Sequence, residues 1–222
     1  MKDLNNIQQL WSIHEKKLLQ QWNINVDLLR KINIDKIERK MNRFIRIKAI
    51  TLGFYILVAF LFIGFVGSSW PDPYLVISGF LLSLWAFSIC YTSMQELKMS
   101  LAIDYADTVP GLQKHLLKLR SNIINFLRIV VWVLPLHLAF VIVFFDLVFG
   151  IHIVQVGNQT WLITQLLISV IVMIPLAIWL HKKLVPENAD KKWMYNLLRG
   201  NGSQIIDSIQ ILEEIRNAER GD

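Results

Sequence analysis

The chain has 222 residues, of which 54% are hydrophobic and 18% charged, against about 25% charged residues in an ordinary soluble domain. A soluble domain of this length could not bury that much apolar surface, so the composition favours an integral membrane protein. The net charge of +6 would suit a nucleic-acid binder, but the placement of the basic residues indicates membrane topology, and we expect no direct nucleic-acid contact. Cys90 is the only cysteine, which excludes an intramolecular disulfide and a cysteine-rich metal site.

Residues 1–48 form a polar N-terminal region in which apolar side chains recur every three or four residues, as on one face of a helix. We expect a first helix that breaks at residues 22–25, with Asn25 capping a second helix. Asp35 and Glu38 have capping-box spacing, which would allow a second break near Asn33 in addition to the first. The second helix carries an apolar stripe of Leu28, Leu29, Ile32, Ile37, Met41 and Phe44.

The stripe of the first helix has two interpretations: it packs into a membrane-proximal helical bundle, or it binds a partner protein. Among the amphipathic segments this helix is the best candidate for the partner surface, because it lies farthest along the chain from a membrane anchor and carries two tryptophans, which are frequent in interface hot spots. The predicted partner-binding residues are Ile7, Leu10, Trp11, His14, Leu18 and Trp22.

Four apolar segments approach or reach the roughly 20 residues that a helix needs to span a bilayer. They cover residues 49–67, 74–94, 129–145 and 161–180, and they form two transmembrane hairpins, 49–94 and 129–181. The predicted fold class is therefore an all-α integral membrane protein, a four-helix transmembrane bundle with cytoplasmic amphipathic helices.

The lysines and arginines predict the orientation of these spans. All 23 of them lie in residues 1–48, in the connection 95–128 and in the tail 182–222, and the two short connections 68–73 and 151–160 carry none. By the positive-inside rule, both termini and the long connection are cytoplasmic. The aromatic residues Trp70, Tyr74, Tyr91, Trp161 and Trp179 lie at span ends, where headgroups favour them.

The connection and the tail also contain amphipathic helices. In the connection, Asp107 or Thr108 is expected to cap a helix that has Pro110 in its first turn and Leu112, Leu116, Leu117 and Leu119 on its apolar side. In the tail, residues 200–203 are expected to break the chain before a last helix with the stripe Ile205, Ile206, Ile209, Leu212 and Ile215.

No motif for catalysis, cofactor binding or metal binding occurs in the chain, so we predict no enzyme, no cofactor and no metal. His137 is the one titratable group near the middle of a span. It follows Pro135, which should kink the helix and free the Val131 carbonyl, and Pro175 should kink the fourth span. Two interpretations of His137 remain: a hydrogen bond between helices, or a role in transport.

Three stretches form a recognisable set: Leu10-Trp11 followed by residues 25–31, residues 104–120 leading to the Pro135-Leu136 pair, and the closing helix 203–219. In these stretches the chain resembles a bacterial family of small multi-span inner-membrane proteins encoded beside extracytoplasmic-function sigma factors. Val109-Pro110 stands in the reverse of the family's order. The resemblance implies location in the bacterial inner membrane, a regulatory role and a sigma factor as partner.

The leading functional hypothesis is a membrane-tethered regulator that binds a cytoplasmic protein, most specifically an anti-sigma factor that covers the polymerase-binding surfaces of its target. The alternative is a transport or transport-accessory subunit, which only His137 and the span prolines support. The partners are thus the lipid bilayer and a cytoplasmic protein, and a homo-oligomer is left open.

Overall fold

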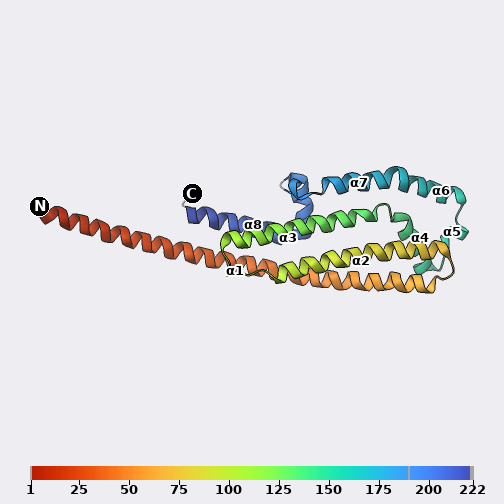
Figure 1. Ribbon diagram of the computed structural model, residues 1–222, viewed down its shortest axis with the longest axis horizontal. Coiled ribbons are helices and arrows are strands. Elements are labelled where there is room, and N and C mark those ends of the chain that lie inside the picture. Colours follow the sequence, from red (N-terminus) through yellow and green to blue (C-terminus); the bar gives the residue numbers. More distant parts are fainter. Residues whose placement is uncertain (1, 190, 221–222) are drawn as a thin grey trace.

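The computed structural model describes residues 2–189 and 191–220, and every regular element in these ranges is a helix, which confirms the all-α prediction. The helices form an elongated bundle, and the N-terminal part of α1 extends beyond it (Figure 1). The elements are α1 (Lys2–Ser68), α2 (Pro73–Leu101), α3 (Val109–Val130), η1 (Val131–Val133), α4 (His137–Phe149), α5 (Ile153–Val156), α6 (Gln159–Ile168), η2 (Ser169–Met173), α7 (Ile174–Lys183), η3 (Pro186–Asn188) and α8 (Lys192–Arg220).

Helix α1 is continuous over 67 residues, so the predicted break at residues 22–25 and the second break near Asn33 are both wrong. An asparagine inside a helix costs only about 0.7 kcal/mol relative to alanine, and no glycine or proline occurs before Gly53. Nothing in this stretch is therefore strong enough to end the helix. At 1.5 Å per residue, α1 is about 100 Å long.

The predicted start of the helix in the long connection is confirmed. Helix α2 ends at Leu101, well beyond its apolar run, and Thr108 caps α3 by accepting a hydrogen bond from the backbone N–H of Gly111 at 3.3 Å. Pro110 lies in the first turn of α3, where its missing N–H would have no helical partner.

The third apolar segment, predicted over residues 129–145, is bent at Pro135, as the kink predicted there requires. The axes of the helices before and after residues 134–136 differ by 68°. Pro135 cannot donate the next helical hydrogen bond, and the Val131 carbonyl accepts from Leu134 N–H instead, at 3.1 Å. This carbonyl is thus satisfied by a tight turn and is not freed as predicted.

The bent pair α3–α4 nevertheless runs from one end of the bundle to the other. Helix α3 starts near the C-terminal end of α2, whereas Asp146 near the end of α4 lines a groove with Ser68, the last residue of α1 (Figure 1). Gly150 ends α4 in the left-handed conformation, with φ of 65°.

The fourth apolar segment consists of α6, η2 and α7, and its backbone is irregular just before Pro175, as predicted. Residues Ser169–Met173 form a π-helix, which accommodates the missing proline N–H without ending the helix. Together α1, α2 and the α6–α7 unit supply three helices that are long and apolar enough to cross a membrane, and the bent pair supplies a fourth if it counts as one.

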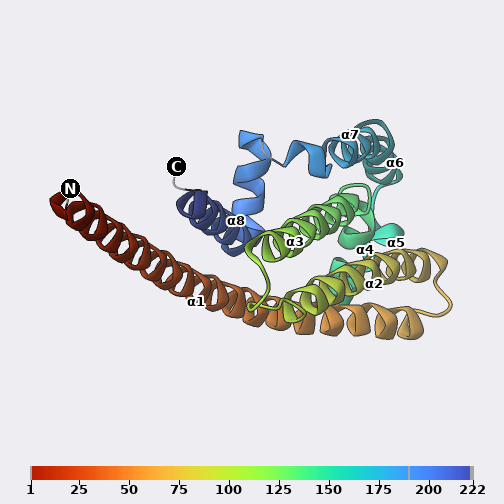
Figure 2. The same ribbon diagram turned by 60° about the vertical axis from the view of Figure 1, so that its left-hand side comes forward.

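Helix α8 is kinked at Gly202, which confirms the predicted break at residues 200–203 (Figure 2). A Cβ atom at this glycine would lie 2.9 Å from Cδ1 of Ile123 on α3. The absence of a side chain therefore lets the second half of α8 approach α3 closely.

Two apolar cores hold the bundle together. The first core joins α1, α3 and α8 and contains most of the predicted stripe residues of the connection and tail; the second joins α1, α2 and α4. The first core includes Ile37, Met41, Phe44, Leu112, Leu116, Leu119, Ile205, Ile209, Leu212 and Ile215, and the second includes Phe62, Phe65, Leu75, Leu82, Ala139 and Ile142.

Candidate functional site

The strongest candidate for a functional surface is the part of α1 that extends beyond the bundle, which we call the projecting segment (residues 11–32). In both ribbon views most of this segment runs clear of the other helices, and only the C-terminal end of α8 lies near its last turns (Figures 1 and 2). The large apolar side chains that the structure describes there are exposed: Trp11 by 73% and Leu18 by 56%, with values from 45% to 58% for Ile24, Leu28, Leu29 and Ile32.

The predicted partner-binding residues that the structure describes lie on this segment. Trp11 and Leu18 are seven residues apart and share one face, with the exposed His14 between them. The side chains of Ile7, Leu10 and Trp22 lie outside the described residues. The apolar stripe of α8 is buried in the first core, whereas Trp11 and Leu18 on the projecting segment are exposed.

A packed base holds the projecting segment where it leaves the bundle. Phe44 is buried in the first core, and the ammonium group of Lys40 lies 2.6 Å from a carboxylate oxygen of Asp207 on α8. Tyr105, in the turn before α3, packs against the same core; burial, and secondarily the charge of Glu38, raises its pKa to about 12. Because α1 is unbroken here, the segment has no hinge of the kind predicted at residues 22–25.

A buried ion pair joins α1 to α2. Nζ of Lys48 lies 2.6 Å from Oε2 of Glu96, and their side chains are 4% and 0% exposed. The ammonium group also lies 5.5 Å from the ring centroid of Phe44 and 4.7 Å from that of Phe126. Sequence analysis missed this pair. One feature of the sequence could have indicated it: Glu96 is the one carboxylate between Asp72 and Asp104. It lies at the end of an apolar run, where a charged side chain usually needs an oppositely charged partner.

Of the residues predicted as an intramembrane polar site, Pro135 and His137 lie at the bend after α3, whereas Pro175 lies in the first turn of α7. Nδ1 of His137 lies 3.0 Å from the Leu134 carbonyl oxygen, and Nε2 lies 3.4 Å from Oε1 of Gln165 on α6. Ser169 Oγ, at the start of the π-helix before Pro175, lies 3.4 Å from Nδ1. His137 thus connects two irregular helices through polar contacts.

The described residues contain no group of three or more His, Cys, Asp or Glu side chains that could hold a metal ion. Comparison with protein-family models, with curated proteins and with solved structures finds no match for the chain. Inferences about function therefore depend on the geometry and charge described above.

Proposed function

We propose that this protein is a membrane-anchored regulator that crosses the bilayer four times, with both termini and the α2–α3 connection in the cytoplasm. Three helices have the required length and apolarity, and the bent pair α3–α4 runs the length of the bundle as a fourth span. The absence of Lys and Arg from residues 68–73 and 151–160 supports this orientation. The resemblance to the bacterial family favours the inner membrane.

Cysteine labelling tests this topology. We expect cysteines introduced at Ser69 and Gln159, in a Cys90→Ala background, to react with a membrane-impermeant thiol reagent in intact cells. A cysteine at Lys114 should react only after the cells are opened, because the connection faces the cytoplasm. Labelling at Lys114 in intact cells, or protection at both outer positions, would contradict the four-span topology.

The exposed apolar face of the projecting segment is the observation that carries the regulatory function. In water, an isolated helix gains no burial from such a face, whereas a partner's groove can bury it in the helix-in-groove mode. Large side chains at helical spacing, with Trp11 at one end, are the usual anchors of that mode.

The partner that fits this surface is a cytoplasmic protein with an apolar groove and an acidic rim. Four basic residues of the segment, Lys16, Lys17, Arg30 and Lys31, outnumber its two carboxylates, Glu15 and Asp27. A complementary acidic rim would orient the helix and accelerate association. The resemblance to the family makes a sigma factor the specific proposal, held inactive while its polymerase-binding surface is covered.

The proposal is tested by asking whether the neighbouring gene encodes a sigma factor, and whether the full chain binds that sigma factor after purification. Replacing Trp11 and Leu18 together with alanine should weaken binding by about thirtyfold or more, because a buried hot-spot side chain is worth about 2 kcal/mol. Lys16→Ala removes one rim charge from another face of the same helix and is the matched control: it should slow association but weaken affinity far less than the double variant does.

Three outcomes would overturn this function. The wild-type chain does not bind the sigma factor; the double variant binds as well as wild type; or the double variant loses thermal stability, which would place the stripe in a core. Self-association of the wild-type chain that disappears in the double variant would assign the surface to a second copy instead.

A further inference from the structure

We infer that the cytoplasmic end of α2 binds an anionic phospholipid, with the phosphate group in a polar groove between α2 and α3 and an acyl chain in an apolar groove between α1 and α2. The inference rests on the membrane insertion proposed above and is independent of the projecting segment and its partner.

The polar groove has the chemistry of a phosphate site. It encloses about 490 Å³ and has no carboxylate in its lining. Lys98 and Lys118 supply positive charge from two helices, and neither has a carboxylate partner among the residues that the structure describes. The remaining lining residues are Gln95, Met99, Ser121, Asn122 and Asn125, most of them donors that phosphate oxygens can use.

Asn122 lines the groove with a half-buried side chain, and its Nδ2 atom has no hydrogen-bond partner among the described residues. Because this atom is shielded from solvent, it can pair with a phosphate oxygen only if the amide group turns toward the groove. Glu96, next to Gln95 in the sequence, faces α1 and is neutralised by Lys48, so it does not cancel the positive charge of the groove.

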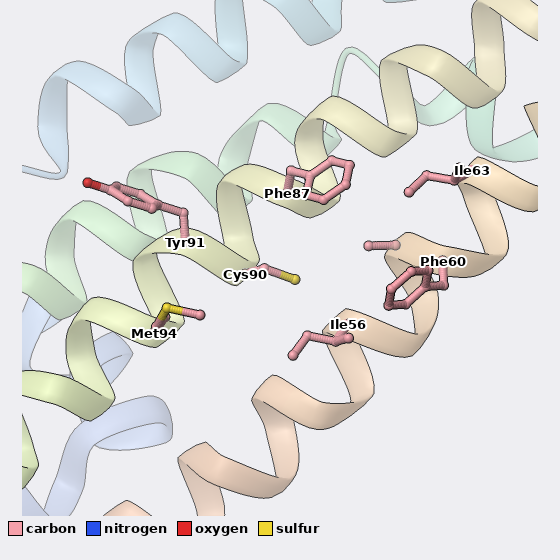
Figure 3. A pocket seen from close by; sticks show the side chains of 8 residues that line it. Ile56, Phe60, Ile63, Phe87, Cys90, Tyr91 and Met94 are labelled. Carbon is pink, nitrogen blue, oxygen red and sulfur yellow. The ribbon is translucent and has the colours of Figure 1, made fainter.

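The apolar groove lies on the neighbouring face of α2 and encloses about 370 Å³. Figure 3 shows Ile63 and Phe60 of α1 on one side and Phe87 and Cys90 of α2 on the other, with the sulfur of Cys90 directed toward α1. Its lining is almost entirely hydrocarbon and sulfur, which suits an acyl chain and gives a free phosphate ion nothing to bind.

The two grooves follow one another along one exposed stripe of α2. Tyr91, Met94 and Lys98 follow one another at three- and four-residue spacing and therefore share a face. Tyr91 and Met94 line the apolar groove, and Lys98 lines the polar one. Along α2 toward its C-terminal end, the apolar groove therefore comes first and the polar groove with its lysines second. This is the order of acyl chain and phosphate in a phospholipid whose headgroup lies at the cytoplasmic surface. This order favours a lipid over a soluble phosphate compound.

Native mass spectrometry of the purified full chain in detergent, with phosphatidylglycerol or phosphatidylcholine added, tests the site. The wild-type chain should bind phosphatidylglycerol about tenfold or more tightly than phosphatidylcholine, whose choline cation offsets the phosphate charge. Lys98→Gln with Lys118→Gln should weaken phosphatidylglycerol binding by about thirtyfold. Lys114→Gln with Lys191→Gln removes the same charge from exposed positions elsewhere and should leave binding unchanged.

A second variant tests the acyl groove without altering charge. Cys90→Phe fills the space between α1 and α2 and should reduce phosphatidylglycerol binding at least fivefold. Unchanged binding by this variant, or equal losses in the two lysine pairs, would overturn the bipartite site. Competition by millimolar inorganic phosphate would assign the polar groove to a free phosphate ligand and overturn the lipid assignment.

These outcomes separate the lipid site from the proposed function. A wild-type chain that shows the four-span labelling pattern but does not prefer phosphatidylglycerol overturns the lipid site alone. Failure of the labelling pattern overturns membrane insertion itself, and sigma-factor binding tests neither.

Discussion

Glu96→Ala is expected to lower the free energy of unfolding by about 3–5 kcal/mol, because it leaves the ammonium group of Lys48 buried without its counter-charge. The ammonium group of Lys48 is buried near the rings of Phe44 and Phe126, so moving it into water would break these contacts. The change should appear as a large drop in the midpoint of unfolding of the detergent-solubilised full chain, followed by tryptophan fluorescence.

A second ion pair provides the matched control for this prediction. Lys40 and Asp207 have the same 2.6 Å separation, but their side chains are 29% and 46% exposed. Because water screens such a pair, Asp207→Ala should cost less than about 1 kcal/mol. The double variant Lys48→Met with Glu96→Leu should recover most of the lost stability by replacing both charges with apolar groups. A loss for Glu96→Ala no greater than for Asp207→Ala would show that the pair is solvated.

Leu116→Ala is expected to destabilise the protein by about 2–5 kcal/mol, as is usual for a cavity in a well-packed core. Leu116 is 0% exposed at the centre of the first core, where α3 meets α1 and α8. The next residue, Leu117, is 39% exposed and gives a control of identical chemistry on the same helix. Leu117→Ala should cost less than about 1 kcal/mol in the same unfolding measurement.

The comparison of the two leucine variants also tests the arrangement of α8. The cavity left by Leu116→Ala should make α8 unfold or detach more readily than α2 and α4. The reason is that α8 packs only in the first core, whereas α2 and α4 pack in the second. Protease cleavage in residues 192–220 should therefore become faster in this variant. Equal destabilisation by the two variants would mean that the first core is assembled on a different face of α3.

Features with a local physical cause were predicted from the sequence. The apolar runs, the Thr108 cap, the irregular backbone at Pro135 and Pro175 and the kink at residues 200–203 each follow from side chains or missing hydrogen-bond donors within a few residues. The predicted break at residues 22–25 was wrong because these residues provide no such local cause. Asparagine and tryptophan only weaken a helix, and nothing there competes with helical hydrogen bonding.

The pairing of distant residues depended on tertiary structure. Lys48 contacts Glu96 because α1 and α2 pack side by side, and Lys98 and Lys118 line the same groove because α2 packs against α3.

The repeating apolar spacing of α8 and of the projecting segment predicts an amphipathic helix in both cases, since periodicity reports which side chains share a face. It carries no information on what covers that face. Only the packing of α8 against α1 and α3 buries one stripe and leaves Trp11 and Leu18 exposed.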